Sequence, residues 1–245
     1  MTHNCKMIIA YDGTRYQGWE HQPGRDTVQG KLESVLERLQ GAPVTVIGAG
    51  RTDAGVHARG MAANAHLESD LTAEEIGAYL NHYLPEDIAV LECREAAPRF
   101  HARYSAVGKL YTYTCYVGDV KPVFDRKYVT VLDYHPDIAK MQAAAKLLEG
   151  EHDFRSFCGT PHMKKSAVRR VDSIEIKEKR GYLYLNFHGT GFLQNMVRIL
   201  TGTLLEVGRG KIAPEEMTAI LEAQDRGCAG PTAPACGLCL MRVDY

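Results

Sequence analysis

The sequence predicts an α+β protein made of two halves, each with the element order β-α-β-β-α-β. Three observations support this prediction: alternating strand-like and helix-like hydrophobic patterns, a break at Pro98, and a later series of elements that repeats the order without repeating the sequence. The expected halves are residues 1–103 and 104–245. We expect each half to be ferredoxin-like and the two antiparallel sheets to join around a central cleft.

In the first half, short strand patterns are separated by clear stop signals. A helical pattern over 28–39 ends before Gly41, and a second one over 72–84 opens with a capping box formed by Thr72 and Glu75. Strands are expected over 7–11, 44–47, 61–67 and 88–91.

The second half repeats this order at a wider spacing. A strand over 109–117 places Tyr111 and Tyr113 on one face, and Arg180-Gly181 marks the turn of a hairpin. The remaining expected elements are helices over 138–148 and 192–207, hairpin strands over 171–178 and 182–187, a short helix from Pro214, and a closing strand over 238–243.

Composition is that of a soluble globular protein, with 45% hydrophobic and 24% charged residues. No apolar run is long enough to cross a bilayer, and the first residues lead straight into a strand pattern rather than a secretory signal. We therefore expect a cytoplasmic protein without a membrane partner.

The seven cysteines are scattered, which in a protein without an export signal favours reduced thiols over a disulfide framework. Cys236 and Cys239, with Cys228 upstream, have the spacing of half a zinc site. No second pair or well-spaced histidine completes four ligands, so we expect no metal.

The formal net charge of −1 is not that of a typical nucleic-acid binder, but binding depends on where basic residues lie. Acidic residues concentrate in the helical patterns. Basic residues gather in segments that also contain glycine, aromatic residues or histidine, and these are either solvated loops or nucleic-acid contacts. They are Arg51 and Arg59, then Arg99, His101, Arg103 and Lys109, then Lys164, Lys165, Arg169 and Arg170.

The densest polar cluster is the small-residue segment 48–60, which lies between two predicted strands. Its small residues allow the backbone to approach a ligand closely. Arg51 can bind phosphate or carboxylate, Asp53 can act as a nucleophile or a base, and His57 can transfer protons. The alternatives are that Asp53 only caps a turn before Gly55 and that His57 is a structural residue.

Arg198 interrupts an almost entirely apolar helical pattern over 192–207 and is expected near its middle. Such a helix should be buried, and a buried guanidinium needs an acidic partner or an anionic ligand unless it reaches solvent along its neighbours. Asp53 is a suitable partner, because an ion pair would keep its carboxylate charged. Tyr111 is either a core residue of its strand or a ring on which a nucleobase stacks.

These residues fall within a series of motifs that resembles the TruA-type tRNA pseudouridine synthases over nearly the whole chain. The central motif is Arg51-Thr52-Asp53-Ala54-Gly55-Val56-His57-Ala58. The others, in order, are Tyr11-Asp12-Gly13-Thr14-x-Tyr16-x-Gly18-Trp19, Thr27-Val28-Gln29-Gly30, Phe100-His101-Ala102-Arg103, Lys109-x-Tyr111-x-Tyr113, His152-Asp153-Phe154, Gly191-Phe192-Leu193-x-x-Met196-Val197-Arg198 and Thr232-Ala233-Pro234-Ala235-x-Gly237-Leu238.

The resemblance implies isomerisation of uridine to pseudouridine at positions 38 to 40 of the tRNA anticodon stem-loop. It implies a homodimer without cofactor or metal, in which Asp53 is the nucleophile. In this scheme Arg51 helps to flip the base, Tyr111 packs on it, Arg198 pairs with Asp53, and Leu238 lines the pocket.

RNA contacts are also expected outside the pocket. Contacts to phosphate would offset the cost of flipping a base without reading sequence. The candidates for binding RNA are Arg59, Phe100, His101, Arg103, Lys164, Lys165 and Arg169. Two other functions remain open at this point: a non-catalytic RNA-binding module, and a small phosphate-ester or acyl-phosphate hydrolase that uses Arg51 as an anion clamp.

Overall fold

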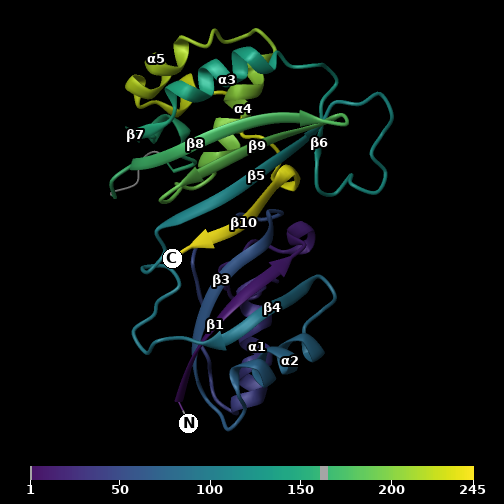
Figure 1. Ribbon diagram of the computed structural model, residues 1–245, viewed down its shortest axis with the longest axis vertical. Helices are drawn as coiled ribbons and strands as arrows, with labels where there is room; N and C mark the ends of the chain where they lie inside the picture. Colours follow the sequence, from purple (N-terminus) through teal and green to yellow (C-terminus); the bar gives the residue numbers. More distant parts are fainter. Residues whose placement is uncertain (1, 161–164) are drawn as a thin grey trace. The chain divides into compact units, whose positions relative to one another are not determined.

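The computed structural model describes residues 2–160 and 165–245, and the chain divides into two compact units. Unit 1 contains Met1–Val107 together with Cys239–Tyr245, and unit 2 contains Gly108–Leu238. The sequence grouped the closing strand with the second half, whereas its contacts place most of that strand in unit 1. Figure 1 shows the ribbon coloured along the chain, with this strand in yellow.

Unit 1 has the predicted element order β-α-β-β-α-β. Its strands run side by side in the order β4-β1-β3-β2, and each neighbouring pair is antiparallel. The returning strand β10 also pairs with β3, in parallel, through Cys239 opposite His57 and Leu240 opposite Ala58. The elements are β1 (Thr2–Tyr11), α1 (Val28–Gln40), β2 (Ile47–Gly48), β3 (His57–Glu68), α2 (Ala73–Tyr83), β4 (Ile88–Glu95) and β10 (Leu238–Asp244).

Unit 2 has an antiparallel sheet with the strand order β5-β9-β8-β7, and the short strand β6 runs parallel to β5. Helix α3 packs against α4 and β8, and α5 packs against α3 and β7. In Figure 1 the three helices gather beside this sheet. The elements are β5 (Gly108–Tyr116), β6 (Thr130–Val131), α3 (Ile138–Leu147), β7 (Gly150–Asp153), β8 (Val168–Lys179), β9 (Tyr182–Gly189), α4 (Met196–Gly208) and α5 (Glu216–Ala223).

Local sequence signals explain several element ends. Gly41 ends α1 in the left-handed conformation at φ 73°, and the capping box predicted for α2 is present, with Thr72 and Glu75 bonded in both directions. Arg180 and Gly181 both have positive φ, at 54° and 78°, as a tight two-residue turn between antiparallel strands requires. The hairpin predicted around them is confirmed as β8 and β9.

The strand predicted over 44–47 is present, but its extent is wrong, because only Ile47 and Gly48 join the sheet. The backbone of Val46 is bonded instead by side chains of α1. Its N–H donates to Glu33 Oε1 at 3.0 Å, and its carbonyl accepts from Gln29 Nε2 at 3.0 Å. These two bonds satisfy the groups that a neighbouring strand would otherwise satisfy.

The protein is therefore a mixed α+β fold of mostly antiparallel strands, with five α-helices among the described residues. The core of each unit is formed by the inner faces of its strands and helices. In unit 1 it includes Met7, Ile9, Leu32, Leu36, Ile76 and Leu80, and in unit 2 Tyr113, Leu185, Phe187, Ile199 and Leu204. Within the described ranges, no helix is both long and apolar enough to span a membrane.

Candidate active site

The Asp53 loop, defined as residues 49–56, connects β2 to β3 and is fixed by the N-terminal segment 11–19. The N–H of Trp19 donates to the carbonyl of Thr52 at 3.1 Å, and the N–H of Gly55 donates to the carbonyl of Tyr16 at 3.3 Å. Asp53 lies between these two anchor points, and its side chain is only partly buried. Its own carbonyl accepts the N–H of Val56 at 3.1 Å, which closes a turn. The loop backbone is thus held on both sides of the carboxylate.

The side chain of Thr52 provides a further anchor next to Asp53 in the chain. Its hydroxyl lies 2.7 Å from that of Tyr11, and both residues are buried. The ring of Tyr11 in turn packs against that of Trp19, with 6.0 Å between the ring centroids. Tyr11 and Trp19 therefore support the Asp53 loop through Thr52.

Two glycines of the segment 11–19 are required by close contact with the loop. A Cβ on Gly13 would lie 2.0 Å from the carbonyl oxygen of Val56, and one on Gly18 would lie 2.7 Å from that of Thr52. Gly18 also has φ +94°, a conformation that other residues rarely adopt. The glycine spacing of this segment thus follows from the need to pack backbone against backbone.

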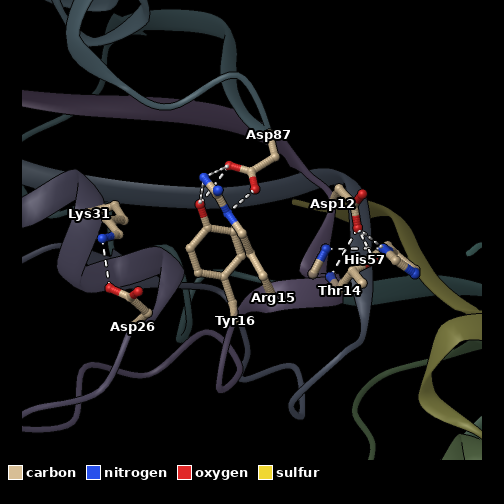
Figure 2. A network of polar contacts seen from close by, with 9 residues as sticks. Asp12, Thr14, Arg15, Tyr16, Asp26, Lys31, His57 and Asp87 are labelled. Carbon is tan, nitrogen blue, oxygen red and sulfur yellow. Dashed lines mark hydrogen bonds and ion pairs between the residues drawn. The ribbon is translucent and has the colours of Figure 1, made fainter.

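His57, at the end of the loop, is buried and has a structural contact. Its Nδ1 accepts the N–H of Gly13 at 3.0 Å, and Asp12 Oδ1 lies 3.2 Å from the same nitrogen. Asp12 Oδ1 also accepts the N–H of Thr14 at 2.9 Å (Figure 2). With Nδ1 accepting, a neutral imidazole carries its proton on Nε2. This geometry supports the structural alternative for His57.

A second polar cluster ties the segment 11–19 to the turn before β4, and sequence reasoning missed it. Tyr16 donates its hydroxyl to Asp87 Oδ1 at 2.6 Å, and Arg15 Nε lies 2.5 Å from Asp87 Oδ2 (Figure 2). Burial, followed by the hydrogen bond to Asp87, raises the pKa of Tyr16 to about 12. The raised pKa favours the protonated hydroxyl that donates to Asp87. Asp87 follows Pro85 at a turn, and no local pattern indicates its distant partners.

Arg51 lies on the exposed side of the loop and binds a carboxylate. Its Nη1 donates to both oxygens of Glu20, at 3.0 and 2.8 Å, and each side chain is 53% exposed. The sequence predicted an anion partner for Arg51, and in the protein alone Glu20 fills that role.

In unit 2, Tyr111 and Leu238 are nearly fully buried, with 8% and 5% of their surfaces exposed. Tyr111 projects from β5 and meets Phe192 edge to face, with the ring centroids 5.4 Å apart at 87°. This contact fixes the plane of the tyrosine ring. Leu238 is the first residue of β10.

Arg198 lies in the first turn of α4 and not near the middle of a helix, so that prediction is wrong. Asn195 adopts φ 58° and starts the helix at Met196, which leaves residues 192–195 outside it. Arg198 Nε donates to the carbonyl of Ala233 at 2.7 Å, and Nη1 donates to Asn195 Oδ1 at 3.0 Å. These bonds orient the guanidinium, which is only partly buried. Its pairing with Asp53 stays a prediction.

Known proteins resemble this chain over most of its length. Residues 7–105 and 144–245, most of the chain, match the family described as tRNA pseudouridine synthase. The chain belongs to the tRNA pseudouridine synthase family. Among its relatives, tRNA pseudouridine synthase A of Moorella thermoacetica is 46% identical over 242 residues, which are 98% of each chain. The protein of the same name from Geobacillus kaustophilus is 46% identical over 246 residues, covering 100% of this chain and 95% of the relative.

A solved structure also aligns with the chain. It is the crystal structure of the archaeal box H/ACA sRNP Nop10-Cbf5 complex, with a TM-score of 0.36 and 15% identity. The alignment covers 82% of this chain but 43% of that one, so the present chain spans less than half of the solved protein. Family membership confirms the expected enzyme class, a tRNA pseudouridine synthase, which is an isomerase that acts on tRNA.

The residues expected to bind RNA in this synthase differ in their surroundings. Arg59, Arg103 and Lys165 are exposed, whereas Phe100 and His101 are partly buried. Arg169 Nη1 is bonded to the carbonyls of Ser166 and Val168 at 3.0 and 2.6 Å. Lys164 lies outside the described residues.

All seven cysteines of the synthase are free thiols. Within the described ranges, no three His, Cys, Asp or Glu side chains come together as a metal site would require. Cys228 is exposed, whereas Cys236 and Cys239 are partly buried.

Proposed function

We propose that this synthase converts uridine to pseudouridine at positions 38, 39 and 40 in the anticodon stem-loop of tRNA, with Asp53 as the nucleophile. The observation that carries the proposal is the fixation of the Asp53 loop. Anchored at Thr52 and Gly55 by the segment 11–19, the loop presents one carboxylate on a backbone that needs no rearrangement before reaction.

The reaction is a balanced isomerisation. The bond from uracil N1 to the ribose C1′ breaks, the ring turns, and a bond from C5 to C1′ forms. The C5 hydrogen leaves as a proton and N1 gains one. Asp53 would assist by a covalent bond to C1′ or C6, or by elimination at the sugar, and loss of the C5 hydrogen is common to these routes.

The pocket residues take the roles that the family resemblance implies. A paired base must leave its stack before its glycosidic bond can be reached, at a cost of a few kcal/mol. In this proposal Arg51 stabilises the flipped state, Tyr111 packs on the base, and Leu238 lines the pocket. Arg198, oriented by Ala233 and Asn195, pairs with Asp53 and keeps it ionised.

The same proposal covers the larger architecture. The half over 1–103 supplies the nucleophile and the half over 104–245 completes the cleft, each with a ferredoxin-like arrangement. The strand order of unit 1, β4-β1-β3-β2, supports this for the first half. The protein works as a homodimer in the cytoplasm, without a cofactor. Exposed basic residues contact phosphates and position the stem-loop without reading its sequence.

The test is the release of tritium from tRNA that carries uridine labelled at C5. Wild-type protein should release tritium, whereas Asp53→Asn should reduce the rate by several orders of magnitude, because the nucleophile is lost. Asp119→Asn makes the same chemical change at an exposed site and should leave the rate unchanged.

Labelled tRNAs with uridine at only one of positions 38, 39 and 40 test the assignment of sites. Each should release tritium, and a tRNA without uridine at any of them should not. Equal release by wild type and Asp53→Asn would remove Asp53 from its proposed role.

A further inference from the structure

The residues that follow β4 form a compact turn built around one imidazole. This turn, residues 101–105, is closed by the N–H of Ser105, which donates to the carbonyl of His101 at 2.9 Å. His101 Nδ1 accepts the N–H groups of both Arg103 and Tyr104, each at 3.2 Å. The His101 ring is therefore fixed by the backbone that it bonds.

Tyr104 projects from this turn into solvent in a defined orientation. Its ring stacks on the imidazole of His101, with the centroids 4.2 Å apart and the planes 29° from parallel. The residue is still 80% exposed, so one ring face is supported and the other is open to water. A single exposed aromatic residue is common, but a tyrosine held flat by its neighbour is a ready surface for a second ring.

Phe100, the aromatic residue that the sequence analysis predicted to contact RNA, has a different environment. Its ring packs against Tyr245 at 5.0 Å, and Lys6 Nζ lies 5.0 Å from its centroid. The hydroxyl of Tyr245 donates to the carbonyl of Ala102 at 2.8 Å. Phe100 and Tyr245 thus support the 101–105 turn from within unit 1, while Tyr104 carries the exposed ring.

The charge around Tyr104 favours an anionic partner. Residues 96–107 contain Arg99, His101 and Arg103 but no aspartate or glutamate. Both arginines are exposed. A stacking ring on a segment with two exposed arginines has the chemistry with which proteins bind unpaired nucleotides, because the ring takes a base and the cations take the adjoining phosphates.

We propose that Tyr104 is a stacking site for an unpaired base of the tRNA, with Arg103 on a neighbouring phosphate. The identity of the ligand as tRNA rests on the proposed function. Stacking accepts any base, so such a contact holds the anticodon loop without restricting which position enters the pocket. This property suits an enzyme that modifies several adjacent positions.

Fluorescence tests whether tRNA reaches the ring. The only tryptophan, Trp19, is 2% exposed, so a tryptophan placed at residue 104 would provide the exposed signal. Tyr104→Trp should be quenched by saturating tRNA. Tyr83→Trp is the matched control, because Tyr83 is 51% exposed on α2 of the same unit, and it should change no more than wild type. No added quenching in Tyr104→Trp would overturn the proposal.

Affinity gives an independent test. Tyr104→Ala should weaken tRNA binding about tenfold, which is about 1.4 kcal/mol at 25 °C, whereas Tyr104→Phe should bind as wild type because it keeps the ring face. Tyr83→Ala should have no effect. Unchanged affinity of Tyr104→Ala, or a change in its oligomeric state instead of its affinity, would overturn the proposal. Tritium release by wild type separates this outcome from failure of the proposed function, which would abolish that release.

Discussion

At the scale of single residues, the position of Asp53 depends on two glycines, which have no side chain, as much as on residues that have one. Gly13 and Gly18 let two backbone segments approach to distances that a Cβ would prevent. The backbone of the Asp53 loop is held by amide and carbonyl contacts, and changes in the segment 11–19 should reach Asp53 through the backbone.

Gly18→Ala tests this dependence. The new Cβ would meet the Thr52 carbonyl at 2.7 Å and displace the Asp53 loop, and a displacement of about 1 Å lowers kcat about a hundredfold. Gly24→Ala is the matched control, because Gly24 has φ +72° but a Cβ added there would meet nothing within 4 Å. It should lose about 1 kcal/mol of stability and keep its activity per folded molecule. Tritium release and thermal unfolding measure both effects, and equal activity losses would contradict the argument.

Structural features that depend on local sequence were predicted well, and contacts between distant segments were not. The capping box at Thr72 and the hairpin turn at Arg180 are short-range and were confirmed. The anchoring of Tyr16 by Asp87 links residues far apart in the chain, and no pattern of spacing reveals it. The polar loop around Asp53 was recognisable, but the contacts that fix it were not.

At the scale of elements, the start of α4 determines where the Arg198 side chain lies. The apolar pattern runs through Phe192 and Leu193, so the predicted helix included residues that lie outside the helix in the structure. The left-handed Asn195 ends that continuity and supplies an amide oxygen to Arg198. Asn195 thus both starts the helix and accepts a hydrogen bond from Arg198, and substitutions can separate these two roles.

Asn195→Gly and Asn195→Ala should differ in stability but not in activity. Both remove the oxygen that accepts from Arg198 Nη1, so both should lower kcat about tenfold through loss of orientation. Only alanine also strains a backbone at φ 58°, and it should unfold with about 1 kcal/mol less stability than glycine. Steady-state kinetics and thermal unfolding test this, and a fully active Asn195→Gly would show that the amide does not position Arg198.

At the scale of the whole molecule, a net charge of −1 hides a division of charge between segments. Glu20 is part of that division, because it forms an ion pair with the guanidinium of Arg51 when no RNA is bound. An RNA that uses Arg51 must displace this carboxylate, so the position of one negative charge should matter more than the total.

Glu20→Gln and Glu92→Gln each remove one negative charge from an exposed ion pair, with Arg51 and Arg94 respectively. Glu20→Gln should tighten tRNA binding about two- to fivefold at low salt, the range expected for an exposed pair. Glu92→Gln should change it less, and the difference should shrink as salt screens the charges. Binding isotherms at several salt concentrations provide the measurement; identical shifts in both variants would mean that only net charge matters.

The return of β10 to β3 has a consequence for how this protein is made. During synthesis, the strand that pairs with His57 and Ala58 emerges only after all of unit 2. Until then this part of β3 lacks that neighbour, and such late, long-range pairing is slow and leaves an edge open to wrong partners. A fragment cut at residue 107 would keep Asp53 and lose β10 beside its loop. Asp53 would then lie beside an incomplete sheet edge, and such a fragment should aggregate rather than serve as a minimal enzyme.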